Sequence, residues 1–241
     1  MTVVRVAALV AAAVVLGCTA TRPPPPNTPS ALWDIVSRCV GREHAGYCTC
    51  PAFALSCCGD PDTPDADVVW AQTADFVAIR DLKMCHCPPD FVAGLALPRV
   101  RVSGIEDPSR PDGIWPFAWD VARTRIADER EIGLVINPAD ARSQNQMHVH
   151  LLRLRPEARQ WLDGRAPTPF GVQVVALPNL DAVFAATLAR VGASHMRDSG
   201  VLVARGRDAG WRAAITDRAS PQAFTVNRCG PLYPNALFRR P

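Results

Sequence analysis

The stretch Gln144-Asn145-Gln146-Met147-His148-Val149-His150-Leu151-Leu152 determines the fold around it, because polar and apolar residues alternate along it. Successive side chains of a β-strand point to opposite faces of the sheet. The pattern predicts a strand over residues 147–154 whose apolar side chains enter the core. On the other face, Gln146, His148 and His150 are predicted to lie side by side.

The flanking sequence contains short runs of apolar and β-branched residues, which are typical of strands. We predict strands over residues 76–80, 91–97, 100–102, 132–136, 201–204 and 211–215. Helical spacing of apolar residues predicts helices over residues 31–40, 116–126, 156–161 and 180–191, with Ser30 as the first N-cap. Strands in runs with helices beside them indicate an α+β fold.

Length and composition indicate one sizeable globular domain, over residues 31–241. Hydrophobic residues make up 48% of the chain and charged residues 20%, and the two signs nearly balance. Arg far outnumbers Lys, but there is no basic run, and the net charge of +3 is too small to favour nucleic-acid binding. We therefore expect no nucleic-acid partner.

Residues 1–17 have the pattern of a secretory signal peptide. Arg5 precedes an apolar run over residues 6–16, shorter than the about 20 residues that a membrane-spanning helix needs. Because residues 15–18 resemble a bacterial lipobox, Cys18 is predicted to be lipidated and to begin the mature protein. An ordinary signal peptide and an uncleaved short anchor are the alternatives. Residues 18–30 contain four consecutive prolines and predict a semi-rigid linker. We expect an exported protein anchored in the bacterial cell envelope.

The cysteine count agrees with export. Nine cysteines less Cys18 leave an even number, which favours disulfides in an oxidising compartment. These residues are Cys39, Cys48, Cys50, Cys57, Cys58, Cys85, Cys87 and Cys229. Most fall in a disulfide-rich insert over about residues 39–87. A zinc site is the alternative, although the spacings are closer than structural zinc pairs usually have.

Two histidines on one face of a strand suit phosphoryl chemistry. A neutral imidazole can attack a phosphate, while its neighbour stabilises the charge or protonates the leaving oxygen. Amide and hydroxyl groups of the preceding loop can hold the phosphate oxygens. Because the nucleophile is a side chain, this chemistry requires no metal or cofactor. From spacing alone, a metal site and an exposed histidine pair stay open as alternatives.

A resemblance to known proteins narrows these alternatives. Residues 134–152 are similar to the histidine-triad signature, three alternating histidines after a phosphate-binding loop. The particular variant resembles the CDP-diacylglycerol pyrophosphatase family, through Ile136-Asn137, Ser143-Gln144-Asn145 and Arg155-Pro156-Glu157-Ala158-Arg159. The similarity is strong over residues 133–163 and loose over about residues 76–204. It implies a histidine-triad-like antiparallel sheet with flanking helices, to which the N-terminal insert is added.

The resemblance also implies roles for individual residues. His148 corresponds to the middle histidine, the nucleophile, and His150 to the third, which contacts the phosphate and assists the leaving group. Phosphate contacts are implied for Asn137, Ser143, Gln144 and Asn145. Gln146 stands where the first histidine is expected and can still support its neighbours by hydrogen bonding. His195 matches a His-Met step of the family; it is either a phosphate ligand or a surface histidine.

The implied reaction is hydrolysis of CDP-diacylglycerol, presented at a membrane surface, to CMP and phosphatidate through a nucleotidyl-histidine intermediate. The alternatives are a histidine-triad hydrolase or transferase for a soluble nucleotide, a non-catalytic lipoprotein that binds nucleotide or lipid, and a metalloenzyme built on the two histidines.

Overall fold

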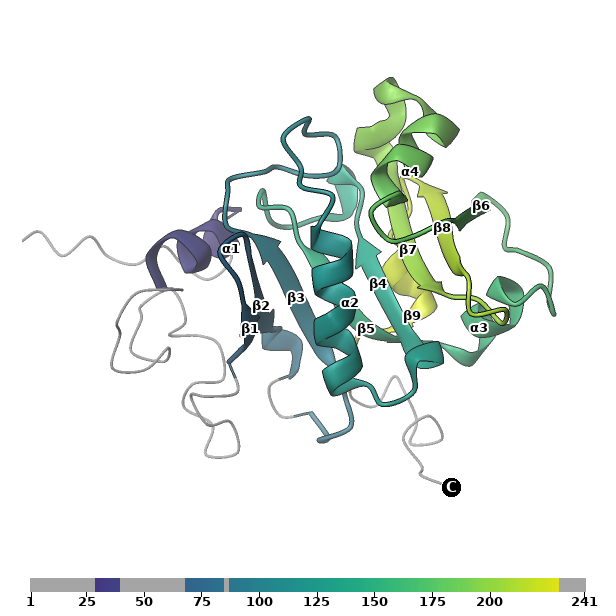
Figure 1. The fold of residues 1–241 in the computed structure, drawn as a ribbon, viewed down its shortest axis with the longest axis horizontal. Helices are drawn as coiled ribbons and strands as arrows, with labels where there is room; N and C mark the ends of the chain where they lie inside the picture. The colour runs from purple at the N-terminus through teal and green to yellow at the C-terminus, as the bar shows by residue number, and fades with distance from the viewer. Residues whose placement is uncertain (1–28, 40–67, 85–86, 230–241) are drawn as a thin grey trace, which may run out of the picture.

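The computed structural model describes residues 29–39, 68–84 and 87–229, and one antiparallel sheet organises them (Figure 1). The spatial order is β1-β2-β3-β5-β4-β7-β8-β6, and β9 pairs with the end of β5. The strands are β1 (Val69–Gln72), β2 (Phe76–Arg80), β3 (Ala93–Pro98), β4 (Ile132–Ile136), β5 (Val149–Leu154), β6 (Val172–Leu177), β7 (Ser199–Arg205), β8 (Trp211–Asp217) and β9 (Thr225–Val226). The predicted α+β class is confirmed as a mixture of helices and antiparallel sheet.

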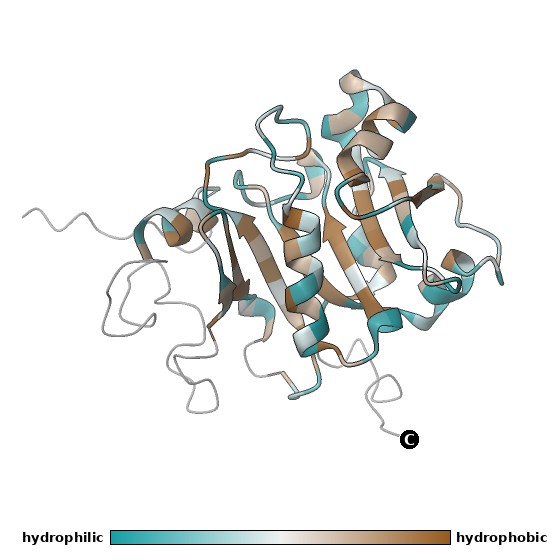
Figure 2. Cartoon of the chain, viewed as in Figure 1, coloured by the Kyte–Doolittle hydropathy of each residue, from teal (hydrophilic) through white to brown (hydrophobic). Residues whose placement is uncertain are grey.

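Helices pack on both faces of this sheet. On one face, α2 (Ile114–Arg125) and α4 (Val183–Val191) share a core with alternate residues of the central strands. On the other face, α1 (Ala31–Asp34) packs over β1 to β3, and α3 (Pro156–Leu162) packs over β4, β7 and β8. Figure 2 shows that the strands are largely hydrophobic, whereas hydrophilic residues gather on helices and loops.

The two-residue period of the strands decides which side chain enters which core. Leu134, Val149 and Leu151 are fully buried against α2. Leu95 belongs to the cluster under α1 and Val135 to the cluster under α3, both on the opposite face. Burial of such a side chain stabilises the fold by about 1.5–3 kcal/mol. Between these two clusters lies the part of the sheet that carries the histidines.

Most predicted elements are present. Residues 76–80 and 132–136 match β2 and β4, and the ends of the other predicted long strands differ by at most two residues. Pro116 lies in the first turn of α2 and Pro156 opens α3, as their fixed φ favours. The predicted helix over residues 31–40 is α1, followed by a π-helical turn, Ile35–Cys39. Strands β1, β6 and β9 were not predicted.

The prediction of a strand over residues 100–102 is wrong. The backbone polar groups of this segment form hydrogen bonds to the loop before β5, and the segment pairs with no strand of the sheet. The Val102 carbonyl accepts the Met147 N–H, and the Gln146 side chain contacts the backbone of Pro98, Val100 and Val102. For the same reason β5 begins at Val149, two residues later than predicted.

One disulfide of the predicted framework joins Cys87 to Cys229, which are 142 residues apart in sequence. The signal peptide, Cys18, the linker and nearly all of the insert lie outside the described residues, so those predictions stay predictions. Within the described ranges, no helix has both the length and the hydropathy needed to cross a membrane.

Candidate active site

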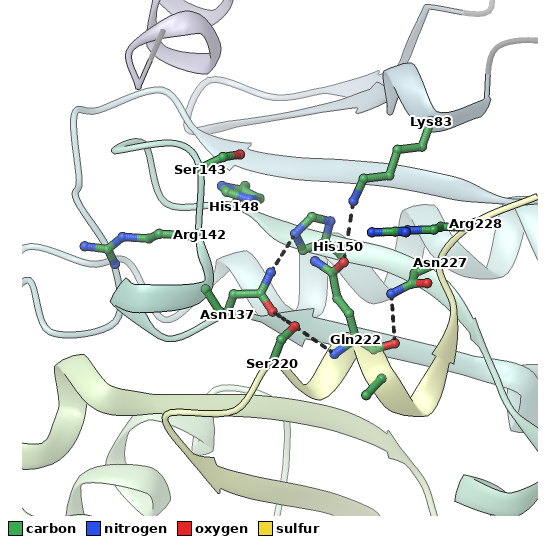
Figure 3. A pocket seen from close by; sticks show the side chains of 12 residues that line it. Lys83, Asn137, Arg142, Ser143, His148, His150, Ser220, Gln222, Asn227 and Arg228 are labelled. Atoms are coloured by element: carbon green, nitrogen blue, oxygen red, sulfur yellow. Dashed lines mark hydrogen bonds between the residues drawn. The ribbon is translucent and has the colours of Figure 1, made fainter. Parts of the chain in front are cut away.

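The two histidines lie on the sheet face opposite α2, at the start of β5. His150 lies between Leu95 of β3 and Val135 of β4, its cross-strand neighbours. His148 directly precedes the strand, and the two rings meet edge to face with centroids 4.7 Å apart (Figure 3). Only 9% of His148 and 5% of His150 is exposed. The predicted juxtaposition of the imidazoles is therefore present, in a largely desolvated setting.

His148 has a defined tautomer. Its Nδ1 lies 2.7 Å from the carbonyl oxygen of Gln146. A carbonyl can only accept, so Nδ1 carries the proton and the lone pair is on Nε2. Burial lowers the pKa of His148 below its ordinary value, and this effect exceeds the opposing one of the hydrogen bond to Gln146. The imidazole is therefore neutral at neutral pH, as a nucleophile requires.

His150 is oriented by a chain of hydrogen bonds. The Ser220 hydroxyl accepts the Gln222 N–H at 3.3 Å and donates to Asn137 Oδ1 at 2.6 Å. The Asn137 amide nitrogen therefore faces His150 Nε2, at 3.3 Å, and donates to it. Because Nε2 accepts this bond, the proton of the neutral ring is on Nδ1. His150 thus offers Asn137 a lone pair and has no proton on Nε2.

Asp81 lies near His150, on the Nδ1 side of the ring. Its Oδ2 is 3.9 Å from His150 Nδ1, too long for a hydrogen bond but close enough for electrostatic attraction. Nδ1 is buried and has no hydrogen-bond partner in the described part of the chain. Burial, with smaller contributions from His148 and Lys83, holds the pKa of His150 well below its ordinary value. The buried His150 ring is therefore neutral at neutral pH.

Gln146 supports the site as a structural residue. It is fully buried, and its amide nitrogen donates to the carbonyls of Pro98 and Val100. Its Oε1 accepts the Val102 N–H at 3.4 Å. The predicted support of the histidines by hydrogen bonding comes from the Gln146 backbone carbonyl, while the side chain fixes the loop that follows β3.

A polar pocket of about 430 Å³ opens over the histidines. Its lining comes from the turns after β2 and β4 and from the chain around β9: Lys83, Asn137, Ala141, Arg142, Ser143, His148, His150, Ser220, Gln222, Ala223, Asn227 and Arg228. Among the described residues, the lining includes three cations and no carboxylate. Glu106 pairs with both terminal nitrogens of Arg142, whereas Lys83 is 3.9 Å from its nearest carboxylate partner, Asp81. The pocket is suited to an anion.

The other predicted site residues separate into two groups. Asn137 and Ser143 line the pocket beside the histidines. Gln144 instead accepts the Leu32 N–H with its side chain, and the Asn145 N–H donates to the Pro29 carbonyl, so both hold the N-terminal segment. His195 is exposed on a 3₁₀ helix, Ala193–Asp198, and does not line the pocket.

The sequence did not predict Lys83 as a pocket residue. It also did not predict the C-terminal wall of the pocket, which residues 220–228 form. Ser220-Pro221 is a helix-start signal, and it does open the short helix η9 (Pro221–Phe224). Nothing local shows that η9 returns to β5, because this position depends on the pairing of β9 with β5 and on the Cys87–Cys229 disulfide.

In the described ranges, the two histidines are not part of a larger cluster of metal-ligating side chains. No group of three or more His, Cys, Asp or Glu side chains there is placed to hold an ion.

Fold and site together define an α+β protein with a buried, neutral histidine pair in a basic pocket. Residues 27–178 match the model of the CDP-diacylglycerol pyrophosphatase family, so the chain belongs to that family. The chain is also 35% identical, over 158 residues, to a "Probable CDP-diacylglycerol pyrophosphatase" of Mycobacterium leprae (strain TN). That match covers 58% of this chain and 50% of the relative, so the chain spans about half the length of that relative. The C-terminal wall of the pocket lies beyond the family match.

Proposed function

We propose that the protein hydrolyses CDP-diacylglycerol to CMP and phosphatidate, with His148 as the nucleophile in a histidine-triad-like site. The observation that carries the proposal is the tautomer of His148, with Nδ1 bonded to the Gln146 carbonyl and a neutral ring lining an anion pocket. Family membership and the name of the M. leprae relative support the substrate.

In the first step, His148 Nε2 forms a bond to the phosphorus of the cytidylyl group. The bond from this phosphorus to the bridging oxygen breaks, and its electron pair stays on the oxygen, which leaves as part of the phosphatidate phosphate. The imidazole gains a positive charge that is shared with Nδ1–H. The hydrogen bond from Nδ1–H to the Gln146 carbonyl therefore becomes stronger.

In the second step, water attacks the same phosphorus and the N–P bond breaks. The electron pair returns to His148 Nε2, CMP is released, and the proton of water passes to solvent. Asn137 and Ser143 line the pocket and, in this proposal, contact the phosphate oxygens as charge redistributes. His150, through Asn137, holds the floor of the pocket in position.

A lipid-linked substrate also fits the predicted attachment to a membrane through Cys18. The Pro-rich segment before the domain would then hold the pocket near the surface that contains the substrate. Export and lipidation remain part of the proposal.

Turnover by the purified full-length protein in detergent micelles tests the function. CMP release is measured from CDP-diacylglycerol, CDP-choline and a diadenosine polyphosphate, with and without EDTA. The proposal expects EDTA-resistant release that is fastest from CDP-diacylglycerol. Preference for a soluble substrate would contradict the lipid assignment, and loss of activity in EDTA would favour a metalloenzyme. Nucleotide binding without turnover would favour a binding protein.

A further inference from the structure

Lys83 is the only lysine in the chain, which has 25 arginines, and it lines the pocket. It lies in the 3₁₀ turn Leu82–Met84, directly after β2. Its Nζ reaches Gln222 Oε1 at 3.5 Å and lies 3.9 Å from Asp81 Oδ2. Its side chain is 44% exposed, so its ammonium can meet a ligand from solvent.

Arg228 reaches the same pocket from the opposite end of the sequence. The preceding residue, Asn227, donates to the Gln222 carbonyl at 3.1 Å, and Cys229 is bonded to Cys87. The disulfide therefore joins the segment that carries Lys83 to the segment that carries Arg228. In Figure 3 both cations lie beyond His150, on the side away from Ser143 and His148.

We infer that Lys83 and Arg228 form a subsite for the leaving phosphate, the phosphate that remains on the lipid. The inference rests on the proposed function and deepens it. In-line displacement places the leaving oxygen on the far side of the reacting phosphorus from His148. In Figure 3 Ser143 lies on the His148 side of the pocket, and Asn137 contacts His150; both suit the phosphate under attack. Lys83 and Arg228 lie on the far side of His150.

Charge compensation and the tautomer of His150 support the same assignment. Arg142 is paired with Glu106, and His150 has a lone pair, not a proton, on Nε2. As the bond to phosphorus breaks, negative charge grows on the leaving phosphate. A cation that meets this charge stabilises the transition state more than the bound substrate. Lys83 and Arg228 thus take the role that the resemblance implied for His150.

A comparison of two substrates distinguishes loss of this subsite from a general effect of the substitutions on the pocket. The leaving group of CDP-diacylglycerol is phosphatidate, which carries a phosphate. The leaving group of the p-nitrophenyl ester of CMP is p-nitrophenolate, which carries none. Lys83→Met and Arg228→Met are expected to lower kcat/KM for CDP-diacylglycerol by about 10²-fold each. They should leave cleavage of the ester near that of the wild type. Arg123→Met, an exposed cation on α2, is the matched control and should alter neither rate.

Equal losses on both substrates would overturn the inference, as would no loss on either. A wild-type protein that cleaves neither substrate would instead refute the proposed function, and the subsite with it. His148→Ala should abolish both reactions.

A binding measurement needs no turnover. Reductive methylation with ¹³C-formaldehyde labels Lys83 as the only side-chain amine of the protein. Short-chain phosphatidate should shift its methyl resonance, and Arg228→Met should weaken the apparent affinity about tenfold. A Lys83 resonance that phosphatidate does not move would contradict the subsite.

Discussion

Hydrogen bonds around each ring give the two histidines different tautomers although only Val149 separates them in sequence. The Gln146 carbonyl places the proton of His148 on Nδ1, and the Asn137 amide occupies Nε2 of His150. In the neutral rings, His148 therefore has its free lone pair on Nε2, as the proposed nucleophile needs, whereas Nε2 of His150 is occupied by the Asn137 amide. The spacing His-x-His could not distinguish these tautomers, since they depend on residues that are distant in sequence, such as Ser220.

The lowered pKa of His148 predicts the pH dependence of the first chemical step. Because the pKa of His148 lies below 6.5, most of the imidazole is still neutral when the pH has been lowered to 6.5. The rate of adduct formation should therefore be constant from about pH 8 down to about pH 6.5 and fall only at lower pH. Rapid-quench measurement of the adduct checks this prediction. A midpoint at or above pH 6.5 would mean that burial does not control the nucleophile.

Gln146→Ala should destabilise the fold. The substitution removes three hydrogen bonds to the backbone of residues 98–102 in a buried setting. Groups left unpaired in the interior cost about 1–3 kcal/mol each, so we expect a loss of about 2–4 kcal/mol by urea unfolding. Gln173→Ala on the exposed face of β6 is the control and should change stability by less than about 0.5 kcal/mol. Equal effects of the two substitutions would contradict the role given to Gln146.

At the scale of elements, the site is formed where β5, the turns after β2 and β4, and η9 meet. Gly200 on β7 allows η9 to approach, because a Cβ there would lie 2.6 Å from Pro221 Cδ and from Thr216 Oγ1. Real side chains do not show such contacts, so a side chain at this position must displace η9. Ser220, which orients Asn137, would then move with it.

Gly200→Ala should therefore lower both the melting temperature and the rate of CMP release, the latter by about tenfold. Gly113→Ala is the matched control, since its Cβ would meet only Phe76 at 3.4 Å or more. An active, fully stable Gly200→Ala protein would show that the position of η9 is unimportant for the site.

Cys229→Ser tests the other attachment of the C-terminal wall. Loss of a native disulfide that closes so long a loop costs about 2–5 kcal/mol. We expect a lower urea midpoint, faster proteolysis after residue 226 and a raised KM for CDP-diacylglycerol. An unchanged KM in the folded variant would mean that the disulfide stabilises the protein without positioning Arg228.

The sequence allowed prediction of the elements that have strong local periodicity. Strand β4, the alternation of β5 and the proline-led start of α3 follow from apolar spacing and from the fixed φ of proline. Strand β6 was missed because it is a half-exposed edge strand without clean alternation. The histidines, Asn137 and Ser143 could be found through the resemblance. Lys83 and Arg228 could not, since only tertiary pairing brings them to the pocket.

Burial of two neutral histidines makes the stability of the whole protein depend on pH. The pKa values of His148 and His150 are lowered in the folded state, so the unfolded chain binds more protons below pH 6.5. This contribution to stability should be complete above about pH 6.5 and lost as the pH falls below it. Urea unfolding at pH 7.5 and pH 5.5 checks the direction. His148→Gln should reduce the difference, and an unchanged difference would contradict the account.

Trapping the proposed intermediate is the direct test of attack by His148 on the cytidylyl phosphorus. The full-length protein in detergent, with EDTA, is mixed with CDP-diacylglycerol, quenched at alkaline pH and examined by peptide mass spectrometry. We expect a cytidylyl group on the peptide that contains His148, absent in His148→Ala and present in His195→Ala. Release of CMP by the folded protein with no adduct at any quench time, or an adduct on another residue, would contradict it.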